Sequence, residues 1–324
     1  MAKAILIDAF GGPEVMEWRD VEITAPQADE VLVRHTAVGL NFIDTYHRSG
    51  LYPLELPAGI GTEAAGIVEA VGRNVQGFKT GDRVAWLGVP PGAYAQFRAY
   101  PAERLVHLPD FIDERMAAAC LLKGLTAWYL LFRSYPAKKG DRVLLYAAAG
   151  GVGSLAAQWA SSLGVRVIGV AGTPEKAERA RSHGCEHVVL ADDQAFVDRV
   201  RELSGGEGVA AVYDSVGRDT FFQSLDCLRR HGTMVTYGNA TGPVDPFSPM
   251  ELARRGSLFV TRPVVFDFIR THEELEHATS VLFDAIESGA LKPVVDQTYP
   301  LSEAARAHRD LEARRTTGST VLLP

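Results

Sequence analysis

The sequence RVLLYAAAGGVGSLAAQWASSL, from Arg142 to Leu163, decides the fold class. It opens with a short apolar run, turns through glycines and continues with residues that favour a helix. A strand, a glycine turn and a helix form the pyrophosphate site of a dinucleotide-binding unit, because glycine lets the backbone approach the phosphates and the helix N-terminus offers N–H groups. The residues predicted to bind a cofactor here are Gly150, Gly151, Val152 and Gly153. Ala148 stands at the first glycine of the GxGxxG pattern, so a turn that serves packing alone is the alternative.

Strand-like runs alternate with helical stretches on both sides of this turn, from about Leu121 onward. Such alternation is typical of βαβ units around a parallel sheet. Six runs fit the two mononucleotide-binding halves of a doubly wound α/β fold, a Rossmann parallel six-stranded sheet. The expected strands are residues 142–146, 165–170, 187–190, 209–214, 233–237 and 258–262.

The chain before about Cys120 has a different rhythm, with short β-branched segments between glycines and prolines. This pattern predicts a β-rich barrel or sandwich. The C-terminal tail contains helical segments at 271–288 and 302–314, a β-like stretch at 293–299 and a closing strand at 319–323, and we expect it to rejoin the N-terminal part. The predicted domains are therefore residues 1–122 with 263–324, and residues 123–262.

Composition narrows the partners of this 324-residue chain, which is 47% hydrophobic and 23% charged, as packed globular proteins are. A net charge of −7 opposes binding to a phosphate backbone, so nucleic acid is not an expected partner. The three cysteines lie far apart in sequence and suit neither a disulfide framework nor a metal site. They indicate a reducing compartment, and the cytoplasm is the expected location.

Neither a secretory leader nor a membrane span is expected. The first residues, MAKAILIDAFGGPE, alternate apolar and polar side chains, whereas a leader needs a continuous apolar stretch. The most apolar region, residues 116–132, is interrupted by Lys123 and Gly124, which we expect to leave too few consecutive apolar residues for a bilayer.

The tip of the second expected strand bears on the choice between NADH and NADPH. An NAD-specific site places Asp or Glu about 20 residues past the glycine turn, where it binds the ribose 2′-hydroxyl. Here Ala171 is followed by Gly172 and Thr173, which leave room for a 2′-phosphate, while Lys176 can supply positive charge. NADPH is therefore the expected cofactor. A solvated helix face is the alternative reading of Lys176.

Several motifs together resemble the zinc-free quinone oxidoreductases, which are related to zeta-crystallin, within the medium-chain dehydrogenase/reductase superfamily. The motifs are VGLNFID at 38–44, GTEAAG at 61–66, KGLTA at 123–127, AAAGGVG at 147–153, YDSVG at 213–217 and YGN at 237–239. The resemblance covers nearly the whole chain and implies a GroES-like catalytic domain beside the Rossmann domain. Zinc enzymes of the superfamily carry metal-binding Cys and His where this chain has Asn41 and Thr62, two residues that bind zinc poorly. The resemblance thus implies chemistry without a metal.

The resemblance also implies roles for individual residues. Asn41 and Thr126 resemble contacts to the nicotinamide and its ribose, Gly172, Thr173 and Lys176 the 2′-phosphate site, and Arg314 a late arginine that returns to the nicotinamide half. Tyr237, Gly238 and Asn239 would follow the cofactor along the sheet edge. One departure is Ala191, which is followed by Asp192 and Asp193 where related bacterial enzymes carry a tyrosine. This departure weakens the NADPH preference and leaves NADH use open.

Without a metal or an evident acid–base pair, the expected reaction is one that the cofactor can carry itself. Hydride or electron transfer from NADPH to a quinone, a planar conjugated acceptor in the interdomain cleft, fits this condition. Asn41, Tyr46 and Tyr52 are the predicted catalytic donors for the developing oxyanion, and the tyrosines could instead pack under a loop. The alternatives are an NADPH-dependent reductase of enones or enals and a cofactor-binding protein with little turnover.

The last expected strand bears on assembly. The residues from Leu258 through Thr261 are short, apolar and at the edge of the sheet, where an unpaired strand invites another chain. The resemblance implies a homodimer that pairs this edge with its copy.

Overall fold

The computed structural model describes all 324 residues, which form two compact units. Unit 1 contains residues 1–123, 269–280 and 293–324, and unit 2 contains residues 124–268 and 281–292. The expected domains assigned everything after residue 262 to the first domain, whereas residues 263–268 and 281–292 pack with the second. The physical reason is close packing: Gly124 leaves room for the Leu282 side chain, and the Lys292 N–H donates to Gln158 Oε1 over 2.8 Å.

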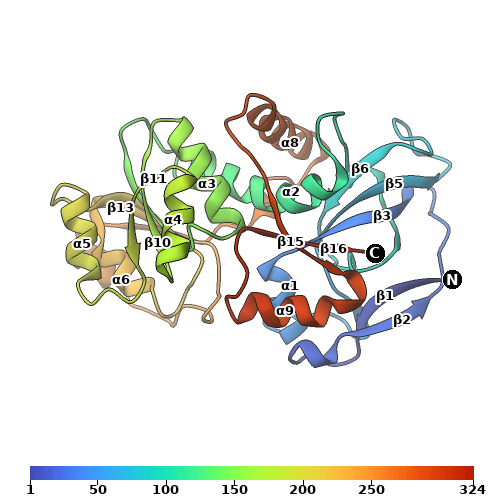
Figure 1. The fold of residues 1–324 in the computed structure, drawn as a ribbon, viewed down its shortest axis with the longest axis horizontal. Helices are drawn as coiled ribbons and strands as arrows, with labels where there is room; N and C mark the ends of the chain where they lie inside the picture. Colours follow the sequence, from blue (N-terminus) through green and yellow to red (C-terminus); the bar gives the residue numbers. More distant parts are fainter. The chain divides into compact units, whose positions relative to one another are not determined.

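Unit 2 is built on a parallel sheet of six strands in the order β11-β10-β9-β12-β13-β14. The strands are β9 (Arg142–Leu145), β10 (Arg166–Ala171), β11 (Cys185–Leu190), β12 (Val209–Asp214), β13 (Leu228–Thr236) and β14 (Phe259–Thr261). The connecting helices are α3 (Gly151–Ser162), α4 (Pro174–Ser182), α5 (Phe196–Leu203), α6 (Phe221–Asp226) and α7 (Met250–Arg254) (Figure 1). The strand order reverses between β9 and β12, as in a doubly wound sheet, so the predicted α/β class and the six strands are confirmed.

Unit 1 is β-rich and draws its strands from both ends of the chain. Its larger sheet has the order β15-β16-β3-β5-β6-β8, with β7 also paired to β3, and its smaller sheet has the order β2-β1-β4. The strands are β1 (Ala2–Ile7), β2 (Glu17–Val21), β3 (Glu30–Leu40), β4 (Ala58–Gly59), β5 (Glu63–Val71), β6 (Arg83–Leu87), β7 (Phe97–Pro101), β8 (Leu105–His107), β15 (Val295–Pro300) and β16 (Ser319–Leu323). Because β16 pairs antiparallel with β3, the C-terminal tail does rejoin the N-terminal part, as predicted (Figure 1).

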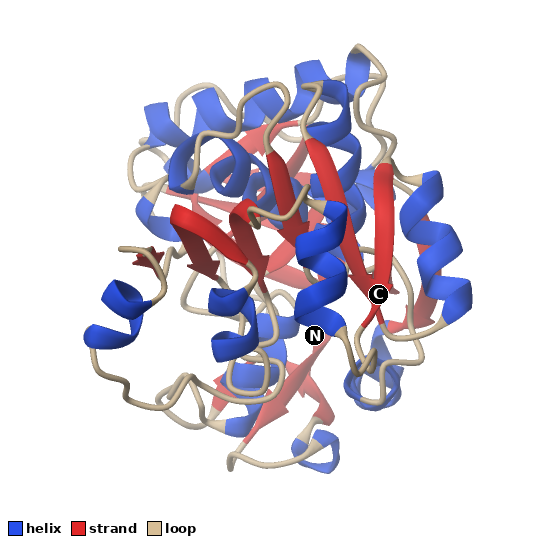
Figure 2. Ribbon diagram, turned by 90° about the vertical axis from the view of Figure 1, so that its left-hand side faces the viewer, coloured by secondary structure: helices blue, strands red, loops and turns tan.

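Helices complete unit 1 and link it to unit 2. They are α1 (Phe42–Ser49), α2 (Glu114–Tyr129), α8 (His272–Glu287) and α9 (Ala304–Glu312), which Figure 1 labels; Figure 2 colours all helices blue and all strands red. Each unit has its own apolar core. Ile5, Trp86 and Leu322 lie in the core of unit 1, and Leu144, Val212 and Phe221 in that of unit 2.

The apolar segment 116–132 lies in one continuous helix, and the expectation that Lys123 and Gly124 leave it too short in apolar residues for a bilayer is not met by length and composition. Helix α2 runs through both residues and continues as a π-helical turn at Leu130–Ser134. The helix from Glu114 to Ser134 is long and apolar enough to cross a membrane by length and composition alone. Its apolar window is 78% buried inside the protein, which is the pattern of a core helix.

Candidate active site

The glycine turn follows β9 at the carboxyl edge of the parallel sheet. Helix α3 begins at Gly151, and its first internal hydrogen bond runs from the Ser154 N–H to the Gly150 carbonyl over 2.8 Å. The N–H groups of residues 151–153 therefore lack helical acceptors and point out of the helix start. A Cβ on Gly153 would lie 2.2 Å from the Ala147 carbonyl oxygen, so glycine is required for this close approach. Such a cradle fits the pyrophosphate of a dinucleotide.

The second element of the site lies at the tip of β10. Thr173 is the N-cap of α4, where its Oγ1 accepts the Lys176 N–H over 3.3 Å. A Cβ on Gly172 would meet nothing within 4 Å, so the space beside the strand tip is open. The Ala191 N–H donates to the Ala171 carbonyl over 2.9 Å, which brings the end of β11 next to this tip. The small residues fit a bulky 2′-phosphate, but Asp192 follows on the same edge.

The third element follows β13. The Tyr237 N–H donates to the Asp214 carbonyl over 2.8 Å, and a Cβ on Gly238 would lie 2.3 Å from the Ser215 carbonyl oxygen. Because β9, β10 and β13 are parallel, the sheet brings Tyr237, Gly238 and Asn239 to the same edge as the glycine turn and Thr173. In open α/β sheets, ligands bind at this carboxyl edge beside the point where strand order reverses.

Asp214 lies beside the candidate site and was not among the residues predicted from the sequence. Its buried carboxylate ends β12 and accepts the Val216 and Gly217 N–H groups through Oδ1, at 2.7 and 3.2 Å. Its Oδ2 accepts the hydroxyls of Thr220 and Ser224, at 2.7 and 3.2 Å. This carboxylate therefore fixes the loop at the reversal point. The sequence did contain a signal for this residue, because Asp214 is an acidic residue at the end of an otherwise apolar strand.

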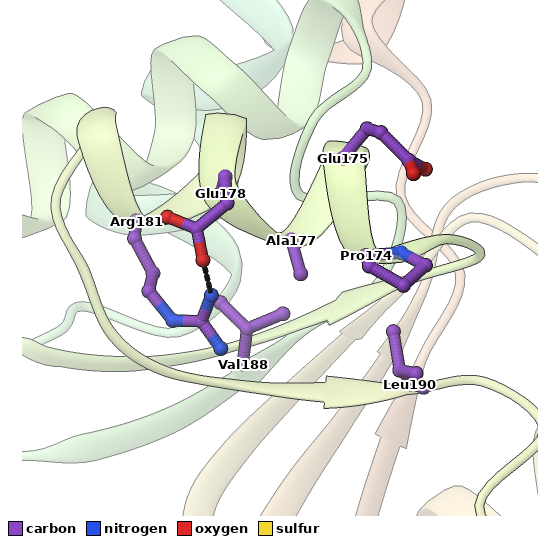
Figure 3. Close-up of a pocket in the computed structure, with 7 residues that line it drawn as sticks. All are labelled: Pro174, Glu175, Ala177, Glu178, Arg181, Val188 and Leu190. Carbon is purple, nitrogen blue, oxygen red and sulfur yellow. Dashed lines mark hydrogen bonds and ion pairs between the residues drawn. The ribbon is translucent and has the colours of Figure 1, made fainter.

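A pocket of about 450 Å³ opens between α4 and β11, beside the cofactor edge (Figure 3). It is lined by Pro174, Glu175, Ala177, Glu178, Arg181, Val188 and Leu190. Arg181 is ion-paired with Glu178, so the one cation in the lining is already neutralised. None of the predicted site residues lines this pocket.

The predicted acceptor side lies in unit 1, around helix α1. Asn41 is the N-cap of α1 and is 6% exposed. Tyr46 lies on the helix, and Tyr52 follows it in the next turn; their ring centroids are 5.3 Å apart in an edge-on arrangement, and the Tyr52 N–H donates to the Tyr46 carbonyl. The three predicted donors thus lie in one segment, before, on and just after α1, and the two tyrosines pack on each other.

A buried chain of polar groups stands behind α1. Asp44 Oδ2 accepts the Asn41 backbone N–H at 2.9 Å and the Tyr94 hydroxyl at 3.0 Å, and Asp44 Oδ1 accepts the Thr62 hydroxyl at 2.9 Å. Tyr94 also contacts His308 Nε2 at 3.0 Å. Burial raises the pKa of Asp44 to about 7, against the effect of these donors. These buried hydrogen bonds fix the start of α1 and therefore the backbone of Asn41.

The side chain of Asn41 is held by Glu63, the residue after Thr62. Glu63 Oε2 accepts the Asn41 Nδ2–H at 2.7 Å, and Glu63 Oε1 accepts the Leu122 N–H at 2.7 Å. Lys123 Nζ lies 3.6 Å from Oε2. Burial raises the pKa of Glu63, while the Lys123 ammonium and the two N–H donors oppose that shift. Glu63 and Lys123 were quoted in the sequence motifs but were not predicted as site residues.

The donor set around Asn41 and Thr62 does not fit a zinc ion. Both side chains are engaged by carboxylates, and an amide and a hydroxyl are not the thiolate, imidazole or carboxylate ligands that zinc prefers. No group of three or more His, Cys, Asp or Glu side chains is placed to hold a metal.

The two remaining predicted residues lie on other parts of the chain. Thr126 is on α2 in unit 2 and is 9% exposed. Arg314 follows α9 in unit 1, is exposed and has φ of 57°, the left-handed conformation that often ends a helix.

Comparisons with known proteins agree with this architecture. Residues 27–110 match the family model of the alcohol dehydrogenase GroES-like domain, and residues 151–282 match the model of the zinc-binding dehydrogenase. The chain is 51% identical to a quinone oxidoreductase of Pseudomonas aeruginosa over 325 residues, with 100% of both chains covered. It is 46% identical to a 2-haloacrylate reductase of a Burkholderia species, covering 100% of this chain and 99% of the relative.

A solved structure gives the same result in three dimensions. The quinone oxidoreductase of Escherichia coli, crystallised with NADPH, superposes with a TM-score of 0.98 at 46% identity, with 100% of both chains covered. Identity at this level over the full length, in both sequence and structure, shows the family. The chain belongs to the quinone oxidoreductase family of the medium-chain dehydrogenase/reductase superfamily.

Proposed function

We propose that this enzyme catalyses a zinc-independent, NADPH-dependent reduction of quinones. The observation that carries the proposal is the glycine cradle at the start of α3 in a chain 51% identical to a quinone oxidoreductase. The replacement of metal-binding side chains by the Asn41–Glu63 and Thr62–Asp44 hydrogen bonds supports the zinc-free part.

The residues of unit 2 would hold NADPH, which supplies a hydride or electrons when bound. The N–H groups of Gly151, Val152 and Gly153, after Gly150, would bind its pyrophosphate. Gly172, Thr173 and Lys176 would surround the 2′-phosphate, and the segment from Tyr237 to Asn239 would continue along the sheet edge. Thr126, Arg314 and Asn41 would contact the nicotinamide half. Asp192 at the β11 edge is the reason to expect some use of NADH as well.

The acceptor would be a planar quinone beside α1. Hydroxyl and amide N–H groups of Tyr46, Tyr52 and Asn41 would stabilise the oxyanion that forms as the quinone is reduced. One N–H of Asn41 already donates to Glu63, so the amide offers a single N–H together with its carbonyl oxygen. The tyrosine rings could also stack on the acceptor.

Reduction of an activated alkene is the second candidate. The 46% identity to a 2-haloacrylate reductase favours it, because the same hydride donor would serve a C=C bond conjugated to a carbonyl or carboxylate.

We further propose a homodimer in the cytoplasm. Strand β14 ends the parallel sheet and pairs only with β13, and its first residue, Phe259, is 61% exposed. An apolar edge of this kind favours pairing with a second copy. All three cysteines are buried, unpaired thiols, which suits a reducing compartment.

An acceptor panel tests the function. Chelator-treated protein is assayed with NADPH and a benzoquinone, a naphthoquinone, an enone and 2-chloroacrylate, and kcat/KM is compared. We expect turnover with a quinone that added zinc does not increase. A larger kcat/KM for 2-chloroacrylate or the enone would favour the alkene reductase, and turnover of alcohols on zinc addition would refute the metal-free proposal.

A further inference from the structure

Lys123 is a buried lysine in the apolar helix α2. The residue is 5% exposed, and its Nζ has no hydrogen-bond partner. Burying an ammonium costs free energy unless an opposite charge compensates it, and a leucine would continue the apolar run of α2 without that cost. The nearest carboxylate is that of Glu63, 3.6 Å away. The lysine therefore needs an explanation beyond packing.

Glu63 is surrounded by donors. The Asn41 amide and the Leu122 backbone N–H each donate to it over 2.7 Å, and Lys123 adds its charge. An ionised carboxylate only accepts hydrogen bonds, whereas a protonated carboxyl also donates one. With Glu63 ionised, Asn41 must turn its NH₂ group toward Glu63 and its carbonyl oxygen away. With Glu63 protonated, the amide could rotate and present its carbonyl oxygen to Glu63 instead.

We propose that Lys123 is a positioning residue that acts through Glu63 on Asn41. Its ammonium keeps Glu63 ionised, and the ionised carboxylate fixes which end of the Asn41 amide faces the ligand. The inference rests on the proposed function, because it gives Asn41 a defined contact with the nicotinamide half of NADPH. With this polarity, the Asn41 carbonyl oxygen accepts a hydroxyl proton of the ribose, and the remaining N–H is available to an oxyanion.

The groups around Glu63 leave Lys123 as the decisive charge. Cys120 and Lys123 face it from α2, Asp44 lies beyond Thr62 on α1, and Tyr94 lies beyond Asp44 in the loop after β6. Cys120 and Tyr94 are neutral, because burial raises the pKa of each above its usual range. Asp44 carries no positive charge in either state. Without Lys123, only neutral donors oppose the burial of the Glu63 charge, and the carboxyl protonates at a higher pH.

The test uses Lys123→Met, which keeps an unbranched side chain one atom shorter and removes its charge, with Lys79→Met as the control at an exposed lysine of the same unit. Infrared spectra of protein labelled with ¹³C-glutamate are recorded over a pH titration, and Glu63→Gln identifies the Glu63 band. We expect the carboxylic-acid band of Glu63 to appear at a higher pH in Lys123→Met than in the parent. This readout does not depend on turnover.

NADPH affinity and kcat/KM for the quinone are then measured against pH. We expect Lys123→Met to lose about tenfold in both at the low-pH end, because the rotated amide turns its NH₂ group toward the ribose and the hydrogen bond from the ribose hydroxyl to the Asn41 carbonyl oxygen is lost. The acidic limb of its profile should lie at higher pH than in the parent. The double variant Lys123→Met/Glu63→Gln removes the titration, so its profile should lose this limb.

The outcomes separate the inference from the proposed function. If the parent binds NADPH but reduces no quinone, the proposed function fails, and the infrared and affinity measurements still decide the role of Lys123. If Lys123→Met unfolds, the double variant, which leaves no unpaired buried charge, is compared with Glu63→Gln; a further loss of NADPH affinity would mean that Lys123 does not act through Glu63. An unchanged Glu63 band or an unmoved acidic limb in Lys123→Met would overturn the inference.

Discussion

Gly153 and Gly172 are both glycines of the proposed cofactor site, but their surroundings differ. A Cβ at Gly153 would lie 2.2 Å from a backbone oxygen that cannot move away, whereas one at Gly172 would meet nothing within 4 Å. We expect Gly153→Ala to lower the free energy of unfolding by about 1–3 kcal/mol, as overpacking does, and Gly172→Ala to leave it within about 0.5 kcal/mol. Urea unfolding of the two variants measures both values. Equal losses would contradict this account of the turn.

Lys176 is the residue on which the 2′-phosphate assignment depends. Its backbone is fixed by the Thr173 cap at the tip of β10, so its side chain starts beside the open space at Gly172. We expect Lys176→Ala to raise KM for NADPH by about 5–30-fold, since a charge-assisted contact to phosphate is lost, and to change KM for NADH little. Lys139→Ala, at an exposed lysine of the same unit, is the control. Equal changes with the two cofactors would reject the assignment.

Among the secondary-structure elements, apolar patterns in the sequence predicted the strands well. Features that depend on polar or charged residues were predicted less well. The strand at Val209–Asp214 has its predicted bounds, because an all-buried strand is a continuous apolar run. Strand β13 begins at Leu228, five residues before its prediction, because the exposed Arg229, Arg230 and His231 hide its start. Lys123 was read only as an interruption of the apolar run in α2, because its charge is compensated by Glu63 on β5, a contact that no local pattern encodes.

The strands β3 and β6 are linked by His35, which gives a prediction about pH. Its Nδ1–H donates to the Ala95 carbonyl over 2.7 Å, and its Nε2 accepts the Trp86 indole N–H over 3.1 Å, so the buried ring is neutral. Burial lowers the pKa of His35 from 6.5 to about 4. The His35 imidazole therefore takes up its second proton more readily in the unfolded chain than in the folded protein. The stability that neutral His35 contributes is lost as pH falls from about 6.5 to about 4.

His35→Gln tests this link, with His277→Gln as the control at an exposed histidine of α8. We expect the parent to lose up to about 3 kcal/mol more unfolding free energy than His35→Gln between pH 7 and pH 4.5. Taking the difference between the two proteins removes the contribution of Asp44, whose raised pKa acts in the opposite direction. Parallel pH profiles for the parent and His35→Gln would contradict the prediction.

For the whole molecule, each half of the candidate site is assembled inside one unit. The glycine turn, Thr173 and Tyr237 meet because parallel strands end at one edge, a consequence of topology that the alternation of strands and helices already predicts. The cluster of Asn41, Glu63 and Lys123 depends instead on β5 and α2 packing beside the start of α1. These three residues are far apart in the sequence, so their contact could not be predicted from it. The motifs indicated Asn41 as a site residue but not what orients its side chain.

Assembly of two copies is the last property that the fold makes testable. Phe259 begins the edge strand β14 with 61% of its surface exposed, whereas the strand at the other edge of the same sheet, β11, packs against α4 and α5. If β14 pairs with its copy, an aspartate at position 259 buries an unpaired charge in the dimer but stays solvated in the monomer. We expect Phe259→Asp to be monomeric by light scattering at micromolar concentration, with an unchanged urea midpoint for the monomer, while the parent and Val294→Asp, at an exposed valine outside the edge, remain dimeric. A monomeric parent would refute the dimer, and a dimeric Phe259→Asp would place the interface on another surface.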